Sequence, residues 1–368
     1  MSSSLNLHLP TPPAKTTIAV AMSGGVDSSV AAAMLVEAGY QVKGIMLKLW
    51  VDPFEANNAR ENSCCTTEAQ EDAHRVAEQL GISLHMLDVG QLFRQRVVDY
   101  FIHEYSIGRT PNPCLMCNRY IRFEQMLTYA VTQMDADFLA TGHYARSRLT
   151  PAGVRLLRGH DRNKDQSYVL SLIPPAHLQR LIFPVGHLTK PQVRALAQVY
   201  ALPVAQKRES QDICFTSDYR SFLQRWAGKT IQPGPIVDES GQVLGQHRGL
   251  AFYTIGQRKG LSLNSPRPLF VLRLDAERNA LVVGSRESLA RTTLLARDVN
   301  WIQEAPTAPT RAHVQIRYRA QEHAATLIPL TQDEIQVQFD SPVTGIAPGQ
   351  AVVFYRQEQC LGGGIIHQ

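Results

Sequence analysis

The chain of 368 residues lacks several features that would define other classes of protein. It has only six cysteines, too few for a disulfide scaffold, and no apolar run near the roughly 20 residues that a membrane span needs. Residues 1–15 are polar and proline-rich, and they lack the apolar core of a secretory signal. We therefore expect a protein of a reducing compartment, the cytoplasm, with a flexible tail over residues 1–15 and no membrane partner.

The overall composition is that of an ordinary globular protein. Hydrophobic residues make up 44% of the chain, and a length of 368 residues suggests two or three domains. The net charge of +5 weakly favours a polyanionic partner. Many enzymes without nucleic-acid partners carry a similar charge, so this observation alone decides little.

The first half of the chain alternates strand-like and helix-like segments. This order predicts a parallel sheet with helices on both faces, and ligands of such sheets bind at the carboxyl ends of the strands. The expected strands cover residues 16–22, 41–50, 83–89 and 137–144, and the expected helices cover residues 28–40, 66–81, 91–105 and 119–133.

After about Phe215 the segments shorten, and glycine and proline become frequent. Alternation of apolar and polar residues at period two predicts antiparallel β structure, with a hairpin turn over Asp275–Ala280. The expected domains are residues 16–213, an α/β domain, residues 214–284, a small central module, and residues 285–368, a β-rich C-terminal module.

The segment AMSGGVDSSV, residues 21–30, joins the first expected strand to the first expected helix. Two glycines allow a tight turn, and the amino end of a helix attracts phosphate. It is not a Walker loop, and the GKT at 228–230 lacks the leading glycine because Leu223 stands there. The string SGGVDSS resembles the pyrophosphatase loop of the N-type ATP hydrolases, which implies cleavage of ATP between its α and β phosphates. Asp27 is a candidate for holding Mg²⁺ or for capping the helix.

Three cysteines are candidates for chemistry: Cys114, Cys117 and Cys214. A second C-x-x-C pair is missing, so we do not expect a complete zinc site. Three thiolates could hold an iron–sulfur cluster, or the thiols could carry sulfur as a persulfide. Helix formation after Cys117 would favour its thiolate, as would the basic residues nearest in sequence, which are Arg109, Arg119, Lys207 and Arg208. For Cys64, Cys65 and Cys360 we expect packing roles or idle thiols.

From about Lys15 to its end, the chain resembles the bacterial tRNA-specific 2-thiouridylases, the tRNA-uridine 2-sulfurtransferases. The motifs that carry the resemblance occur in this order: SGGVDSS, GRTPNP…CN, ATGHYAR, LLRGHDRNKDQSY, FPVG…KPQVRALA, SQDICF, YTIGQRKGL, RYR and CLGGGII. The resemblance implies an N-terminal ATP pyrophosphatase domain like the adenine nucleotide α hydrolases, and a C-terminal β-barrel that binds tRNA.

The resemblance also implies the reaction, an ATP-dependent 2-thiolation of the wobble uridine. The uridine C2 oxygen would be adenylylated, Cys214 would receive sulfur as a persulfide, and Cys117 would be the nucleophile that attacks that persulfide. The residues implied in ATP binding are Ala21, Met22, Ser23, Gly24, Gly25, Val26, Asp27, Ser28, Leu47 and Gly142.

The same resemblance implies contacts with tRNA. Some relatives have aspartate at the position of Cys114, and if its acid/base role is needed, His143 or a water must supply it. In RYR, Arg317 and Arg319 are expected on one face of a strand and Tyr318 on the other. The basic segment 247–261 is equally compatible with RNA contact and with a plain β module. The implied contact residues are Asn112, Pro113, Cys114, His143, Lys164, Asp165, Gln166, Arg317, Tyr318 and Gln350.

The expected cofactors are ATP with Mg²⁺ and no protein-bound metal, with an iron–sulfur cluster as the alternative. The expected partners are the anticodon arm of tRNA and a sulfur donor such as a cysteine desulfurase or a sulfur-relay protein. Rival functions are an amidating ligase of the same ATP superfamily and a non-catalytic tRNA-binding module with a degenerate loop. The sequence does not specify which tRNAs are used, which donor loads Cys214, or the oligomeric state.

Overall fold

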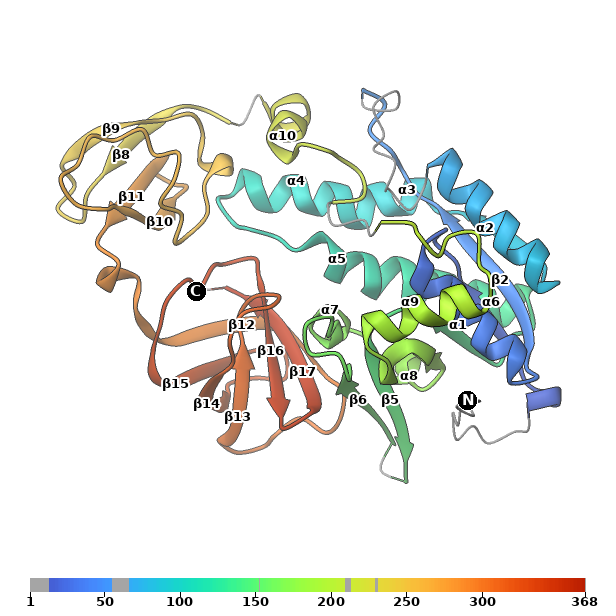
Figure 1. Ribbon diagram of the computed structural model, residues 1–368. Coiled ribbons are helices and arrows are strands. Elements are labelled where there is room, and N and C mark those ends of the chain that lie inside the picture. The colour runs from blue at the N-terminus through green and yellow to red at the C-terminus, as the bar shows by residue number, and fades with distance from the viewer. Residues whose placement is uncertain (1–12, 55–65, 152, 209–212, 229–230, 368) are drawn as a thin grey trace. The chain divides into compact units, whose positions relative to one another are not determined.

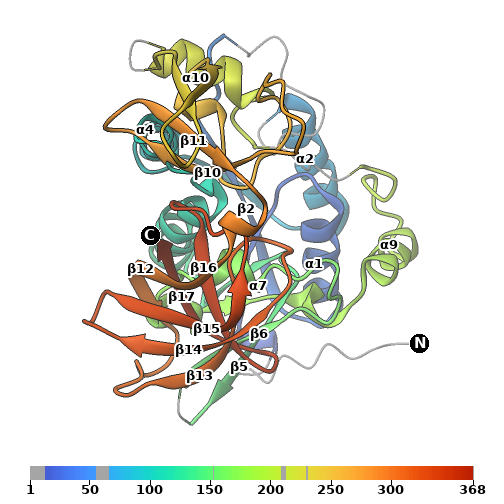
Figure 2. The same ribbon diagram turned by 90° about the vertical axis from the view of Figure 1, so that its left-hand side faces the viewer.

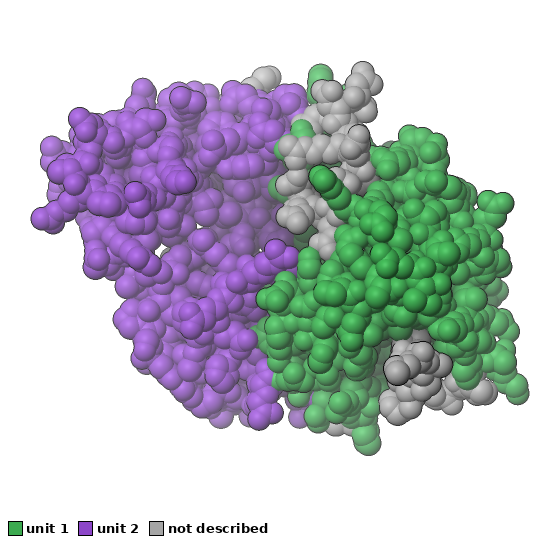
Figure 3. Space-filling model, viewed as in Figure 1, with its two compact units in different colours: residues 1–96, 114–217, 358–361 green, residues 97–113, 218–357, 362–368 purple. Residues whose placement is uncertain are grey.

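The computed structural model describes residues 13–54, 66–151, 153–208, 213–228 and 231–367. The chain divides into two compact units, each assembled from separate stretches (Figure 3). The first unit comprises residues 1–96, 114–217 and 358–361, and the second comprises residues 97–113, 218–357 and 362–368. Within the described residues, no helix combines the length and the apolar character needed to cross a bilayer.

The first unit contains a five-stranded sheet in the order β3-β2-β1-β4-β7, in which all neighbouring strands are parallel. The predicted parallel sheet is confirmed, and only the two-residue strand β7 was not expected. The strands are β1 (Thr17–Ala21), β2 (Gln41–Lys48), β3 (Leu84–Asp88), β4 (Phe138–Thr141) and β7 (Leu181–Ile182).

Helices cover both faces of this sheet, as predicted. Apolar residues of α1 (Val26–Glu37), α2 (Thr67–Leu80) and α9 (Lys190–Val199) share one core with Val42 and Met46 of β2. Side chains alternate along a strand, so Lys43 points to the opposite face. There its amine donates to the carbonyl of Met134, at 2.6 Å, just after α6 (Leu127–Gln133).

The helix ends follow from local chemistry. The Oγ1 of Thr66 accepts a hydrogen bond from the Ala69 amide at 3.1 Å and caps α2. At the other end of α2, Gly81 adopts a left-handed φ of 66°, a conformation that glycine adopts without a Cβ penalty. Gly39 likewise follows the end of α1 with a φ of 84°.

Two long helical runs each contain a π-helical stretch, which is rare and is found often at functional sites. The first run continues through α3 (Gly90–Phe93), the π segment Arg94–Val98 and α4 (Asp99–Ser106). The second continues through α5 (Pro113–Met116), the π segment Cys117–Met126 and α6. It begins at Pro113, six residues earlier than Arg119, where the sequence pattern placed its start. Proline is well suited to a first helical position because it has no amide hydrogen to leave unsatisfied.

The first unit also contains a hairpin of β5 (Ala145–Thr150) and β6 (Gly153–Arg158). Leu157 and Leu156 of β6 pair with Gln359 and Cys360. The remaining short elements of this unit are the 3₁₀ turn Pro13–Lys15, α7 (Ser167–Leu170), α8 (Pro175–Leu178) and the 3₁₀ turn Pro184–His187.

After Ser217 the chain returns to the second unit with a helix that the sequence analysis did not predict, α10 (Tyr219–Ala227). Both carboxylate oxygens of Asp218 accept from amides of its first turn and cap it, and Phe222 packs against Phe101 of α4 at 6.2 Å between ring centroids. A four-stranded sheet follows in the order β10-β11-β8-β9. Its strands are β8 (Gly234–Val237), β9 (Val243–His247), β10 (Phe270–Asp275) and β11 (Ala280–Gly284).

The predicted hairpin between β10 and β11 is confirmed, since the two strands are antiparallel and Asn279 in the turn has a φ of 46°. Two 3₁₀ turns, Leu250–Phe252 and Glu287–Leu289, complete this module. Its core gathers residues from the sheet and from the segment 250–261, including Ile236, Tyr253 and Leu281.

The last part of the second unit is a closed six-stranded β-barrel (Figures 1 and 2). Its strands follow the order β12-β15-β14-β13-β16-β17, and pairing between β12 and β17 closes the ring. The predicted β-rich C-terminal barrel is therefore confirmed. The strands are β12 (Arg291–Trp301), β13 (Thr310–Gln315), β14 (His323–Pro329), β15 (Ile335–Val343), β16 (Ala351–Arg356) and β17 (Gln359–Ile366).

Candidate active site

The loop between β1 and α1 is shaped by close backbone packing. Gly24 has a φ of 65°, and a Cβ there would lie 2.2 Å from the carbonyl oxygen of Ala69 on α2. Gly25 occupies the N-cap of α1 and has no side chain with which to cap it. Amides at the start of α1 can therefore donate to a bound anion, which the helix dipole also attracts.

The serines of the loop fix its shape. Ser28 Oγ donates to the Gly25 carbonyl at 3.1 Å and lies 3.2 Å from Ser23 Oγ. The Ser23 amide also donates to Ser28 Oγ, at 3.3 Å. Ser29 Oγ donates to the same carbonyl of Gly25 at 2.8 Å. The structure therefore brings together the loop residues that the sequence assigned to ATP.

Gly142, the predicted ATP contact that follows β4, lies against the start of α1. A Cβ at Gly142 would be 2.6 Å from the Ser28 amide nitrogen and 2.7 Å from the Asp27 carbonyl carbon. Only glycine fits there without moving either the backbone of Gly142 or the backbone at the start of α1. Leu47, the other predicted contact outside the loop, is buried near the carboxyl end of β2. Both predicted residues thus lie at the carboxyl ends of strands, where parallel sheets bind ligands.

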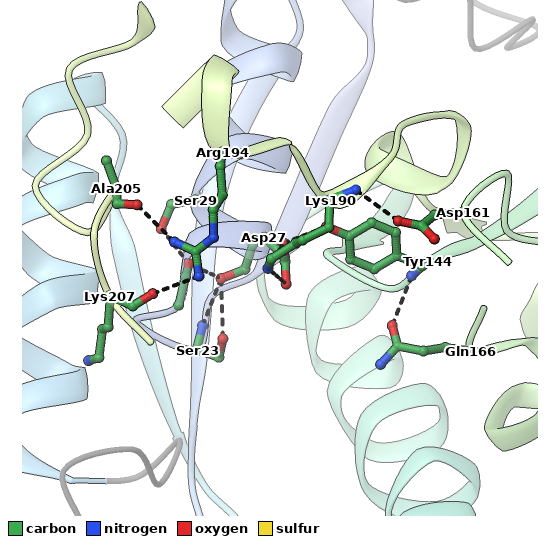
Figure 4. Close-up of polar contacts among 12 residues, drawn as sticks. Ser23, Asp27, Ser29, Tyr144, Asp161, Gln166, Lys190, Arg194, Ala205 and Lys207 are labelled. Carbon is green, nitrogen blue, oxygen red and sulfur yellow. Dashed lines mark hydrogen bonds and ion pairs between the residues drawn. The ribbon is translucent and has the colours of Figure 1, made fainter. Parts of the chain in front are cut away.

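Asp27 does not cap α1, because Gly25 holds that position. Its two carboxylate oxygens accept hydrogen bonds from Lys190 Nζ at 2.7 and 2.9 Å, and Oδ1 also accepts from the Tyr144 hydroxyl at 2.8 Å (Figure 4). The Lys190 side chain is 10% exposed and that of Asp27 is 29% exposed. This ion pair is consequently shielded from solvent, which strengthens it compared with a surface pair.

Lys190 was missed as a site residue by sequence reasoning, which used KPQVRALA only as a landmark of the resemblance. A signal was present, because Lys190 is the first residue of α9 and a cation is unfavourable at the amino end of a helix. A residue that opposes the local preference indicates a compensating partner, and here that partner is Asp27.

Two predicted tRNA contacts, Asp165 and Gln166, make hydrogen bonds within the protein. Gln166 Oε1 accepts from the Tyr144 amide at 2.9 Å, and the Gln166 amide donates to the Tyr144 carbonyl at 2.9 Å. Asp165 accepts from Arg158, the Gly159 amide and Ser167 at 2.9–3.0 Å. Asp165 and Gln166 therefore order the segment that holds Tyr144 beside Asp27, whereas Lys164 is half-buried in the same segment.

His143 lies next to the loop and is held as a neutral imidazole. Its Nδ1 is 2.7 Å from Thr141 Oγ1, and its ring packs against those of Phe123 and Phe183 at 5.7 and 6.3 Å. This desolvation, together with the charge of Arg122, lowers the pKa of His143 to about 3. The lowered pKa favours the neutral imidazole over the cationic form at physiological pH.

The cysteine pair lies on the second helical run rather than in a loop before it. Cys114 is exposed at the second position of α5, and Cys117 is buried where the π segment begins. The expectation that a helix begins after Cys117 is therefore wrong, because the helix already starts at Pro113. The next residue, Asn118, is buried and its side-chain amide donates to the Val169 carbonyl at 3.0 Å, which fixes the helix beside α7.

Cys214 is a half-exposed thiol held in place by its neighbour. Phe215 is buried and packs edge-on against Phe93 of α3, with 5.9 Å between ring centroids. Cys114, Cys117 and Cys214 all belong to the first unit, which also contains the loop between β1 and α1. Cys360 is fully buried, in agreement with the expected packing role, and Cys64 and Cys65 lie outside the described residues.

The basic residues near the cysteines in sequence interact with other groups. Arg109 Nε lies 3.3 Å from Glu104, and Arg109 also donates to the Ile366 carbonyl at 3.1 Å. Lys207 forms an ion pair with the buried carboxylate of Asp72. The Arg119 guanidinium lies over the Tyr120 ring at 5.2 Å. Two of the basic residues that were expected to stabilise a thiolate, Arg109 and Lys207, are therefore paired with carboxylates.

In the second unit, two predicted tRNA contacts join separate segments of the chain. The Gln350 side-chain amide donates to the Thr110 carbonyl at 2.8 Å, beside Asn112 of the GRTPNP segment. Arg317 donates to the Ile255 carbonyl at 2.9 Å, in the basic segment 247–261. Gln350 and Arg317 thus connect the barrel to the segments that carry the family motifs.

The prediction that RYR forms a strand is wrong. β13 ends at Gln315, and Arg317–Arg319 forms a turn in which Arg319 has a left-handed φ of 60°. The Arg319 guanidinium lies over the Tyr318 ring at 5.2 Å. The two arginines therefore do not share one face of a strand, because alternation of side chains applies only to extended backbone.

Among the residues that the structure describes, no group of three or more His, Cys, Asp or Glu side chains comes together in a way that could hold a metal ion. Mg²⁺ that enters with ATP needs fewer protein ligands, since it is typically held by one or two carboxylates and by substrate phosphates. Asp27 is the carboxylate at the loop that fits this requirement, and the amine of Lys190 now neutralises it.

The structure thus has an α/β domain with a glycine-containing loop between its first strand and its first helix, followed by two β modules. Models of three protein families match the chain in this order: tRNA methyl transferase HUP domain over residues 16–218, tRNA methyl transferase PRC-barrel domain over residues 220–285, and aminomethyltransferase β-barrel domain over residues 291–366.

Curated relatives identify the family more closely. The tRNA-specific 2-thiouridylase of Moorella thermoacetica is 50% identical over 353 residues, which cover 94% of this chain and 98% of that protein. The enzyme of the same name from Symbiobacterium thermophilum is 47% identical over 364 residues, which cover 97% of this chain and 93% of that protein. The chain belongs to the family of tRNA-specific 2-thiouridylases, and the expected enzyme class, a sulfurtransferase, is confirmed.

The likeness to solved structures is weaker. The U34-tRNA thiolase NcsA from Methanococcus maripaludis, solved with its [4Fe-4S] cluster, has a TM-score of 0.35 and is 17% identical, and the match covers 61% of this chain and 69% of that one.

Proposed function

We propose that this protein catalyses the ATP-dependent 2-thiolation of the wobble uridine of tRNA, by adenylylation of the C2 oxygen followed by transfer of sulfur from a cysteine persulfide. Family membership supports this function. The observation that carries it is that one compact unit contains both a loop built for phosphate and the cysteines Cys117 and Cys214. An amidating ligase would need the loop but would have no use for the two thiols.

In the first half-reaction, the loop residues 21–28 bind the triphosphate of ATP, which brings its Mg²⁺ with it. The uridine C2 oxygen attacks the α-phosphorus, an O–P bond forms, and the bond to the bridging oxygen breaks so that pyrophosphate leaves. The amides of the loop and the dipole of α1 stabilise the charge that develops on the phosphates. The C2 oxygen thereby becomes part of AMP, a far better leaving group.

In the second half-reaction, Cys214 carries a sulfane sulfur that a donor has loaded. Cys117 attacks the Sγ of Cys214, the S–S bond to the terminal sulfur breaks, and the released sulfide attacks C2 and expels AMP. Alternatively, the terminal sulfur attacks C2 first, and Cys117 then cleaves it from Cys214. Both routes leave a Cys117–Cys214 disulfide, so a thiol reductant must supply two electrons before the next cycle.

His143 suits a polar but uncharged role beside the target base. Since burial and Arg122 lower the pKa of His143 to about 3, its ring can exchange hydrogen bonds with the uridine without bringing a second charge to the adenylylated intermediate. The target base must leave its stack to reach this site. We propose that Asn112, Pro113 and Cys114 contact that base, and that Lys164, Arg317, Tyr318 and Gln350 contact the rest of the anticodon arm.

We propose residues 16–213 as the ATP pyrophosphatase domain, residues 214–284 as a central module and residues 285–368 as the tRNA-binding barrel. We also propose the cytoplasm as the compartment, where thiol reductants are available. The sulfur donor is proposed to be a cysteine desulfurase or a sulfur-relay protein, because either class delivers sulfur as a persulfide.

The test is mass spectrometry of nucleosides from tRNA after reaction with ATP and a persulfide donor. The unaltered enzyme should yield 2-thiouridine derivatives at the wobble position together with AMP and pyrophosphate. Cys117→Ser and Cys214→Ser should each abolish the thiolated nucleoside, whereas the matched Cys64→Ser control, for which no role is proposed, should not. Full thiolation by either site variant would contradict the persulfide route, and thiolation without AMP formation would contradict adenylylation.

A further inference from the structure

Helix α9 begins with a buried lysine that faces the loop between β1 and α1. The Lys190 amine lies 2.7 and 2.9 Å from the two carboxylate oxygens of Asp27, and the Lys190 side chain is 10% exposed (Figure 4). Asp27 itself belongs to the first turn of α1, where the helix dipole favours a negative charge. Two positive groups, the amine and the amino end of α1, therefore lie at this one carboxylate.

The backbone at Lys190 is held independently of the ion pair. The Lys190 amide donates to Asp161 Oδ2 at 3.0 Å. About one turn further along α9, Val193 is fully buried in the core cluster that also includes Val26 of α1. The flexible stem of a lysine allows its amine to move while the helix stays in place. The side chain of Lys190 can therefore change its partner without a shift of α9.

Tyr144 holds Asp27 from a second side. Its hydroxyl donates to Asp27 Oδ1 at 2.8 Å, and its own backbone exchanges two hydrogen bonds with Gln166, each of 2.9 Å. The Lys190 amine lies 5.9 Å from the centre of the Tyr144 ring, whose face attracts cations. Because Tyr144 is buried and fixed, the carboxylate keeps a neutral donor, and with it an orientation, when the amine leaves.

A bound triphosphate changes the balance of charge at this pair. Mg²⁺ that enters with ATP is held by carboxylate and phosphate oxygens, and Asp27 is the one carboxylate of residues 21–30. A desolvated amine that loses its counter-charge is costly, so it takes the nearest anion. In the proposed function that anion is the triphosphate, which accepts hydrogen bonds from the amides at the start of α1.

We propose that Lys190 is a catalytic residue that exchanges partners, from Asp27 in the free enzyme to the phosphates of bound ATP. This proposal rests on the proposed function. Asp27 then serves as a ligand of Mg²⁺, and the released amine donates to the triphosphate oxygens. There it offsets the negative charge that grows on the departing pyrophosphate. In the absence of nucleotide, the pair with Asp27 keeps the amine at the loop.

Calorimetry with a non-hydrolysable ATP analogue distinguishes a phosphate ligand from a mere partner of Asp27. At saturating Mg²⁺, Lys190→Met should bind the analogue at least about tenfold more weakly than the unaltered enzyme, because a charge-assisted hydrogen bond is lost. If Lys190 only neutralised Asp27, the same substitution would free that carboxylate for Mg²⁺ and leave binding unchanged or tighter. Lys15→Met, at an exposed lysine before the amino end of β1, is the matched control and should bind the analogue normally.

A second comparison removes Asp27 from the measurement. In EDTA, the double variant Asp27→Asn/Lys190→Met should bind the analogue about tenfold more weakly than Asp27→Asn alone. The double variant leaves no buried charge unpaired at this position, so it keeps the test available if Lys190→Met does not fold, which urea denaturation shows. At saturating ATP and tRNA, ATP–pyrophosphate exchange by Lys190→Met should also fall on the order of a hundredfold.

Equal affinities in either comparison would overturn the contact between Lys190 and phosphate, and undiminished exchange at saturating ATP would overturn its catalytic role. Both results leave the proposed thiolation intact, because nucleoside mass spectrometry of the unaltered enzyme measures it separately. Failure of the unaltered enzyme to bind the analogue at all would instead overturn the ATP site, and the role of Lys190 with it.

Discussion

The ATP loop and the cysteine segments belong to the same unit but are held by different means. Close backbone packing shapes the loop. A Cβ added at Gly24 or at Gly142 would lie less than 3 Å from backbone atoms of another segment. The cysteines are held by side chains instead, through the buried Asn118 beside Cys117 and the buried Phe215 beside Cys214. The shape of the loop therefore depends on backbone packing, whereas the positions of the two cysteines depend on contacts of neighbouring side chains.

The largest expected effect concerns the two loop glycines. Gly24→Ala and Gly142→Ala each place a methyl group within 3 Å of a backbone, and a displacement of about 1 Å at a reacting centre costs on the order of 10²-fold in rate. ATP–pyrophosphate exchange in the presence of tRNA measures this loss. The matched control is Gly81→Ala, at a φ of 66° but with nothing within 4 Å of its Cβ. If this control loses exchange as severely, backbone strain rather than the shape of the loop explains the result.

The next effect concerns the ion pair at the loop. Asp27→Asn leaves the buried amine of Lys190 without its counter-charge, which should lower the free energy of unfolding by about 2 kcal/mol, less than a fully buried pair because Asp27 is partly exposed. Exchange should be lost as well, since the loop loses its carboxylate for Mg²⁺. Urea denaturation and the exchange assay separate the two effects. Normal exchange in Asp27→Asn would remove Asp27 from the ATP site.

A smaller effect concerns His143 and pH. The pKa of His143 is about 3 in the folded protein and near 6.5 in an unfolded chain, so between these values only the unfolded chain binds the proton. Stability from this group is therefore complete above about pH 6.5 and falls as the pH drops toward 3. In His143→Asn, the urea midpoint should change less between pH 7 and pH 5 than in the unaltered protein. An identical pH dependence would show that His143 is not desolvated.

The smallest expected effect lies in the second unit. Arg317→Ala should weaken tRNA binding and reduce the slope of log K against log salt by about 0.7 to 0.9, the contribution of one phosphate. Filter binding across a salt series measures it, with Arg356→Ala on the exposed end of β16 as the comparison. An unchanged slope would assign Arg317 to its hydrogen bond with Ile255 alone.

The sequence predicted the elements that obey simple periodicity. The strands around β1, β2, β3 and β4 and the hairpin between β10 and β11 are encoded by neighbouring residues, so a local pattern is sufficient. The turn at Arg317–Arg319 was missed because a tertiary contact fixes it, whereas the start of α5 at Pro113 had a local signal, proline at a first helical position, that the prediction did not use. At Arg317, for example, the bond to Ile255 joins residues 62 positions apart.

Residues of the candidate site divide in the same way, into those that a local motif predicts and those that only a long-range contact reveals. The loop residues from Ser23 to Ser28 carry a compact motif and were found from sequence, whereas Lys190, 163 positions after Asp27, was not. Arg194 lies within the landmark KPQVRALA, yet its hydrogen bonds to the carbonyls of Ala205 and Lys207 become visible only in the structure. Long-range pairs of this kind cannot be read from one sequence because nothing local specifies the partner.

The most direct test of the central claim follows the oxygen that sulfur replaces. An anticodon arm with ¹⁸O at the C2 position of its wobble uridine would be thiolated with ATP and a persulfide donor, and the released AMP and pyrophosphate analysed by mass spectrometry. If the C2 oxygen is adenylylated, the ¹⁸O label leaves in AMP. Label found in phosphate, pyrophosphate or water, with unlabelled AMP, would contradict the account.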